Sequence, residues 1–148
     1  MADIRHRIGI NAPAATVYDQ LATVEGLEGW WTDTIEGASE VGDKLTFYFR
    51  SRDRKAVMEV VELVPDAHVT WRCVDGPEEW IDTNIEFDLR AAGDETVVMF
   101  THGDWREPVE FMHHCSTKWG YFLLGLKDRL EGGAAAPHPH DRLISSWG

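Results

Sequence analysis

The feature that most constrains this fold is a change of hydrophobic period two-thirds of the way along the chain. Over residues 44–102 apolar side chains alternate with polar ones, as in half-buried β-strands. Over residues 108–131 they recur every three or four positions, which predicts one long amphipathic helix. Neither the stripe of a helix nor one face of a sheet can be buried alone. The pattern therefore predicts an α+β domain in which a curved sheet wraps around a long C-terminal helix.

Short turns between the strand-like segments favour an antiparallel meander, and we expect a sheet of about six to seven strands. Two short helices should follow the first strand. We take residues 1–131 as a single domain and 132–148 as a C-terminal tail whose last apolar residues dock back. The predicted strands cover 3–11, 44–51, 55–64, 68–74, 80–90 and 95–102, and the short helices cover 13–22 and 24–32.

Charge and cysteine usage narrow the classes of protein. The 26 acidic and 14 basic side chains give a net charge of −12, which argues against nucleic acid as a partner because it needs a basic surface. No apolar run is long enough to span a membrane, and the N-terminus lacks a secretory signal, so we expect a cytoplasmic protein. Cys73 and Cys115 have no metal-binding or disulfide spacing and should be buried free thiols.

Seven tryptophans in 148 residues point to an apolar cavity between the sheet and the long helix. One alternative is that these same bulky side chains fill the space as a solid core. For the adjacent pair Trp30 and Trp31, either one indole faces the cavity and the other packs outward, or both plug the end of the sheet. The predicted lining is Trp30, Trp31, Phe47, Phe49, Trp71, Phe87, Phe100, Met112, Cys115, Trp119 and Phe122.

Candidate catalytic residues are few. His102 ends a predicted strand and could act as a general base, or could simply be hydrogen-bonded at the cavity rim. His113 lies beside Glu110 in a pattern that a di-iron site would use, but the other ligands of such a site are missing. We therefore interpret this cluster, and the tail residue His138, as surface. No metal site and no cofactor are predicted.

The order of these elements resembles the helix-grip fold of the SRPBCC superfamily, which includes START-like lipid-transfer domains, the birch-pollen allergens and polyketide cyclases. More closely, the chain is similar to the AHSA-like branch, named after the activator of the ATPase of the 90-kilodalton heat-shock protein. The resemblance rests on IGINAPAATVY (8–18), EGLEGWW (25–31), VVELVP (60–65), VTW (69–71), ETVVMFTH (95–102) and the helix segment 119–130. It implies a cavity between sheet and helix, in a superfamily that also holds stress-linked proteins.

Three functions compete at this point. The first is a carrier of a small hydrophobic or amphipathic molecule, with no catalytic machinery. The second is an enzyme of the cyclase or dehydratase kind, in which His102 or His113 moves a proton. The third is a module that interacts with the chaperone, as the branch name suggests; a homodimer is compatible with all three.

Overall fold

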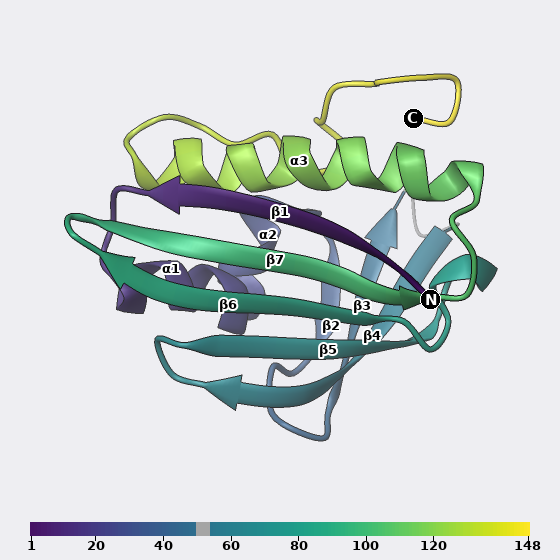
Figure 1. Ribbon diagram of the computed structural model, residues 1–148, viewed down its shortest axis with the longest axis horizontal. Helices are drawn as coiled ribbons and strands as arrows, with labels where there is room; N and C mark the ends of the chain where they lie inside the picture. The colour runs from purple at the N-terminus through teal and green to yellow at the C-terminus, as the bar shows by residue number, and fades with distance from the viewer. Residues whose placement is uncertain (50–53) are drawn as a thin grey trace.

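Seven antiparallel strands form one sheet that curls beneath the long helix (Figure 1). The computed structural model describes residues 1–49 and 54–148, and in them the strand order is β1-β7-β6-β5-β4-β3-β2. The sheet is a meander with β1 returned to its far edge, where it pairs with β7. The strands are β1 (Ala2–Ile10), β2 (Ile35–Gly37), β3 (Lys44–Phe49), β4 (Arg54–Val64), β5 (His68–Asp75), β6 (Asn84–Ala92) and β7 (Glu95–Trp105).

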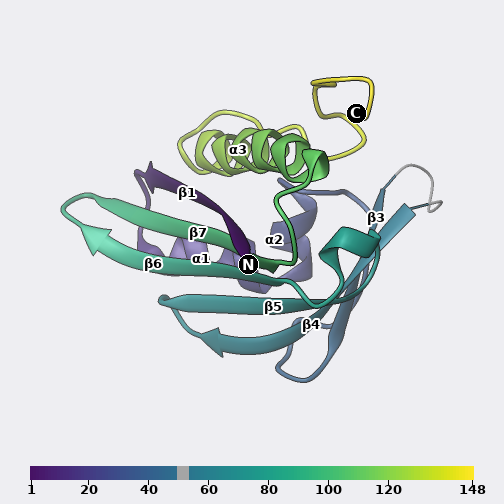
Figure 2. The same cartoon turned by 45° about the vertical axis from the view of Figure 1, so that its right-hand side comes forward.

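The long helix, α3 (Glu110–Leu130), lies across the concave side of this sheet, closest to β1 (Figure 2). Its first turn carries Glu110 and its last turn carries Lys127 and Arg129, which is the charge order that suits the helix dipole. The short helices α1 (Ala14–Ala22) and α2 (Val24–Glu28) pack on the sheet, where α1 contacts β5 and β6 and α2 contacts β2. The α+β helix-grip architecture is therefore as predicted. None of the helices in the described residues is long and apolar enough to cross a membrane.

Strand register brings the inward-facing aromatic residues together. Phe87 of β6 lies opposite Phe100 of β7, and Trp71 of β5 lies opposite Ile85 of β6. All four side chains are buried. Because alternate residues of a strand point to the same face, the period-two pattern of the sequence is enough to place them inside.

The second short helix is shorter than predicted, and this changes the position of the tryptophan pair. α2 ends at Glu28, so Trp30 and Trp31 follow the helix, and both are buried. The expectation that one of them packs outward was wrong. In a helix, adjacent residues project about 100° apart, but the turn after Gly29 removes that constraint. Trp30 is part of the core, whereas Trp31 also lines the pocket described below.

Other boundaries also differ from prediction. The strand expected at 80–90 begins only at Asn84, because a 3-10 turn (Glu78–Trp80) and the positive φ of Asp82, 70°, precede it. The short edge strand β2 was not predicted, since three residues carry too little periodicity. The last two residues of the strand predicted at 44–51 lie outside the described residues.

Candidate functional site

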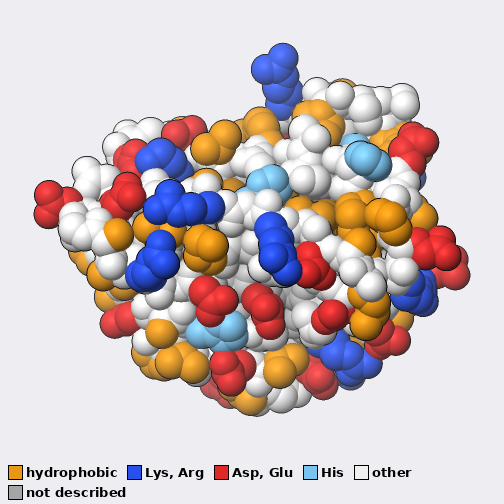
Figure 3. All heavy atoms as spheres, in the orientation of Figure 1, with side chains coloured by type: hydrophobic (Ala, Val, Ile, Leu, Met, Phe, Trp, Pro, Cys, Tyr) orange, Lys and Arg blue, Asp and Glu red, His pale blue; other side chains and the backbone are white. Residues whose placement is uncertain are grey.

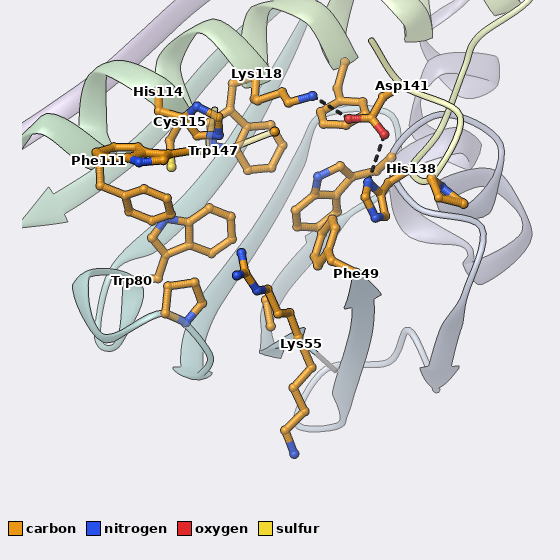
Figure 4. Close-up of a pocket in the computed structure, with 18 of the residues that line it drawn as sticks. Phe49, Lys55, Trp80, Phe111, His114, Cys115, Lys118, His138, Asp141 and Trp147 are labelled. Atoms are coloured by element: carbon orange, nitrogen blue, oxygen red, sulfur yellow. Dashed lines mark hydrogen bonds and ion pairs between the residues drawn. The ribbon is translucent and has the colours of Figure 1, made fainter. Parts of the chain in front are cut away.

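A pocket of about 460 Å³ opens between the first half of α3, the β3–β4 end of the sheet and the tail (Figure 4). Its volume falls within the range of small-molecule sites. The described residues that line it are Trp31, Phe49, Arg54, Lys55, Ala56, Pro77, Trp80, Phe111, His114, Cys115, Lys118, Trp119, Phe122, His138, Pro139, Asp141, Leu143, Trp147 and Gly148.

Aromatic rings form most of the pocket wall. Trp80 stacks on Trp119 with ring centroids 6.3 Å apart, and Trp119 in turn lies 4.9 Å from Trp31. Phe111 adds a further ring 6.4 Å from Trp80. Helical spacing explains the contribution of α3, because Phe111, Cys115 and Trp119 are four residues apart and share one face.

The tail supplies the remaining wall. Its backbone is anchored where His138 N–H donates to Trp31 O at 2.8 Å and His138 O accepts from Asp33 N–H at 3.0 Å. Farther along, the indole of Trp147 lies 6.4 Å from the ring of Phe111. The tail, whose last apolar residues were expected to dock back, thus forms part of the pocket.

A chain of polar side chains joins the tail to the helix at the pocket wall. Lys118 Nζ lies 2.5 Å from Asp141 Oδ2, and the other oxygen of Asp141 lies 2.8 Å from His138 Nδ1 (Figure 4). The Lys118 and Asp141 side chains are only 14% and 5% exposed. Burial raises the pKa of Asp141, but its hydrogen bond to Lys118 and the neighbouring positive charges outweigh this, so the pKa lies below its ordinary value. Asp141 is therefore a carboxylate at neutral pH.

The sign of charge at the pocket is opposite to that of the whole molecule. Of the permanently charged side chains lining its described part, Arg54, Lys55 and Lys118 are cationic and only Asp141 is anionic. Lys55 points away from the pocket and lies 3.7 Å from Asp75 (Figure 4). Arg54 is exposed, whereas the Lys118 side chain is buried in the apolar wall, with its ammonium 5.7 Å from the ring centroids of Tyr121 and Phe122.

The predicted catalytic histidines lie elsewhere. His102 is fully buried; its Nδ1 accepts from the Trp119 indole at 3.1 Å, and its Nε2 lies 2.8 Å from Thr83 Oγ1. The indole can only donate, so Nδ1 is unprotonated, and Nε2 carries the proton. Burial lowers the pKa of His102 to about 3. These contacts favour the structural interpretation of His102, and His113 is exposed on α3 away from the pocket lining.

Two further titratable groups, Cys115 and His114, line the pocket, and burial shifts the pKa of each. Burial raises the pKa of the Cys115 thiol to about 12, so it is protonated and a poor nucleophile. His114 packs against Phe111 with centroids 6.0 Å apart, and its pKa is lowered by burial and by Lys118. Both cysteines are buried free thiols, as predicted.

The predicted cavity residues divide into two groups. Trp31, Phe49, Cys115, Trp119 and Phe122 line the pocket. The others are in the solid core or packed against it: Trp30, Phe47, Trp71, Phe87, Phe100 and Met112.

Sequence reasoning missed Trp80, Phe111 and Lys118 as lining residues, and it did not predict that the tail lines the pocket. Phe111 could have been found, because it lies one turn before Cys115 on the same helical stripe. His138, interpreted from sequence as surface, has a side chain only 17% exposed. The tail has no regular period, so nothing in its sequence predicts where it folds back.

Acidic, basic and apolar side chains are mixed on the face of the molecule seen in Figure 3, without gathering into one large patch. His68 is paired with Asp88 at 2.5 Å and with Glu62 at 3.3 Å. In the described part of the chain, no group of three or more His, Cys, Asp or Glu side chains is arranged to hold a metal ion.

Comparison with known proteins gives a consistent result. A family model described as "Activator of Hsp90 ATPase homolog 1-like protein" matches residues 11–131. The solution structure of the Aha1 dimer from Colwellia psychrerythraea is similar at 43% identity, with a TM-score of 0.82 over 90% of this chain and 98% of that one. No curated protein matches the sequence.

Two more distant structures are similar in fold alone. SSP2350 from Staphylococcus saprophyticus is 20% identical, with a TM-score of 0.76 over 92% of this chain and 97% of that one. CalU16 from Micromonospora echinospora is 18% identical, with a TM-score of 0.74 over 93% of this chain and 77% of that one.

Proposed function

Since the chain belongs to the family of Activator of Hsp90 ATPase homolog 1-like proteins, we propose that it binds a small hydrophobic or amphipathic molecule in the pocket beside α3. The observation that carries this proposal is the pocket itself: about 460 Å³, walled by aromatic rings, with few polar groups. Sites of this composition bury most of a small ligand and use their polar groups to orient it.

The chemistry of the lining supports binding more than turnover. The Cys115 thiol is protonated, because burial raises its pKa to about 12. Lys118 and Asp141 are paired with each other. Covalent catalysis needs an activated nucleophile beside a base, and this thiol is not activated.

The test is a fluorescence titration with the neutral probe N-phenyl-1-naphthylamine. We expect the unaltered protein to bind it and Phe111→Glu to abolish binding, because a charge in the aromatic wall would have to be desolvated. Leu124→Glu is the matched control: it makes the same kind of change on the same helix, at a side chain that is 53% exposed and outside the pocket. Failure of the unaltered protein to bind either this probe or its sulfonated analogue, 1-anilinonaphthalene-8-sulfonate, or equal binding by the two variants, would refute the proposal.

A cyclase-like enzyme is the second candidate, and the His138–Asp141 pair favours it. A carboxylate 2.8 Å from Nδ1 orients an imidazole so that the opposite nitrogen can accept a proton. This pair replaces His102 and His113 as the candidate for proton transfer. If the protein turns over a short β-polyketone thioester, His138→Gln should abolish the reaction. His140→Gln should not, because His140 is 71% exposed and outside the pocket lining.

We further propose a homodimer, on the analogy of the Aha1 dimer that this chain resembles. Light scattering after size exclusion would test it. The family description also suggests contact with Hsp90, for which recovery of the chaperone on immobilised protein is the test. A cytoplasmic location is consistent with the two free thiols. Residues 1–131 remain our proposed domain, with 132–148 as a tail that completes the pocket.

A further inference from the structure

The buried pair of Lys118 and Asp141 is the least expected feature of the pocket. An apolar wall disfavours charge, because each ion loses its hydration on burial. Here an ammonium and a carboxylate, 14% and 5% exposed, stand among aromatic rings at 2.5 Å separation. Lys118 also donates to Arg142 O at 2.7 Å.

The two charges come from very different elements. Lys118 is in the middle of the 21-residue helix α3, whereas Asp141 lies in the tail, in a stretch without helix or strand. The backbone of Lys118 is thus held within a helix, whereas its counter-charge is on a segment without regular backbone hydrogen bonding. An uncharged molecule displacing Asp141 would leave Lys118 buried and unpaired, which is costly. A molecule with an acid group would restore the pair.

We propose that the ligand is an amphipathic anion, an aromatic or aliphatic body with one acid group, and that its acid takes the place of Asp141 on Lys118. This inference rests on the proposed binding function and specifies its ligand class. The apolar body lies on the rings of Trp80, Phe111 and Trp119, next to Lys118 on the same pocket wall. Asp141 occupies the anion position in the absence of ligand, so the tail competes with the ligand.

The experiment compares two probes that share one ring system. 1-Anilinonaphthalene-8-sulfonate carries an acid group, and N-phenyl-1-naphthylamine is the same molecule without it. We expect Lys118→Met to weaken binding of the sulfonate about tenfold and Asp141→Asn to strengthen it about tenfold, as for one charge-assisted hydrogen bond. Binding of the neutral probe should change less than about twofold in both variants. Lys127→Met, which removes a lysine of α3 outside the pocket lining, is the charge-matched control.

The decisive result is that the two variants change the sulfonate affinity in opposite directions, lower in Lys118→Met and higher in Asp141→Asn. If the ion pair only holds the tail in place, breaking it from either side has the same effect, and the ratio of the two affinities stays constant in both variants. That result would overturn the inference. So would an unaltered protein that binds the neutral probe but not the sulfonate, although the proposed binding function would survive. Binding of neither probe would refute both. If Lys118→Met does not fold, Lys118→Arg must retain sulfonate binding, and added salt must weaken the sulfonate more than the neutral probe.

Discussion

The two ends of the interior contain the same kinds of side chain but differ in what completes them. At the closed end, Trp71 lies 5.4 Å from Phe87 and Phe87 lies 5.2 Å from Phe100, so rings from β5, β6 and β7 contact one another. At the open end, a pocket remains between α3 and the sheet, and tail residues from His138 to Gly148 form part of its wall. Strands and the turn that carries Trp30 supply the ring partners of the closed end, whereas the open end depends on the tail, in which there is no helix or strand.

This difference separates stability from binding. Side chains at the closed end are buried by their neighbours in the sheet, so the fold itself requires them. Pocket residues such as Trp147, which is 46% exposed, have fewer partners and contribute little to folding. We therefore expect substitutions at the closed end to change the free energy of unfolding, and those at the open end to change affinity.

The largest effect is expected from opening the closed end. Phe87→Ala removes a fully buried ring that contacts Trp30, Trp71 and Phe100. It should lower the free energy of unfolding by about 3–5 kcal/mol, from lost burial plus the cavity left behind. Urea unfolding followed by tryptophan fluorescence measures this. Met99→Ala, at a side chain 42% exposed, should change it by less than about 0.5 kcal/mol. Similar losses in both variants would remove the distinction.

A second, smaller effect on stability is expected from His102, which accepts a hydrogen bond from Trp119. Burial lowers its pKa from 6.5 to about 3. Below pH 6.5 the unfolded chain therefore binds a proton that the folded protein excludes, and stability falls as pH decreases towards 3. Between pH 6.5 and 4.5 this should cost about 2 kcal/mol, from about 1.4 kcal/mol per pKa unit.

The comparison is between the unaltered protein and His102→Gln, each unfolded by urea at several pH values. The variant should be less stable at pH 7, yet lose less stability on acidification. Carboxylates with lowered pKa, such as Asp141, contribute in both proteins and cancel in the difference. Parallel pH profiles would show that His102 does not titrate as its burial requires.

The closed end could be predicted from sequence, because it follows from periodicity. Alternation placed Trp71, Phe87 and Phe100 inside. Short turns between successive strands are then enough to bring these residues together in the sheet. The failure concerned Trp30 and Trp31, where a helix was extended past Glu28. Periodicity describes regular elements and has no information about a turn that buries two adjacent residues.

The open end could be predicted only in part, for the same reason. Its helical wall was accessible through the stripe of Cys115, Trp119 and Phe122, but the opposite wall belongs to the tail. The tail is held by single hydrogen bonds, such as Arg142 N–H to Tyr121 Oη at 3.2 Å. Contacts of this kind link residues far apart in sequence and leave no pattern. The pairing of Lys118 with Asp141, 23 residues later, is another example.

The smallest expected change in stability is at the tail, and it sharpens the comparison most. Trp147→Ala removes a ring beside Phe111 and His114 at the pocket mouth. Because Trp147 is 46% exposed, the free energy of unfolding should change by less than about 0.5 kcal/mol. Binding of N-phenyl-1-naphthylamine should nevertheless weaken about fivefold, the value of one aromatic contact. Leu143→Ala, also in the tail and 71% exposed, should weaken it less. If Trp147→Ala instead lowers stability by several kcal/mol and leaves binding unchanged, the tail belongs to the core, and the two ends do not differ as we infer.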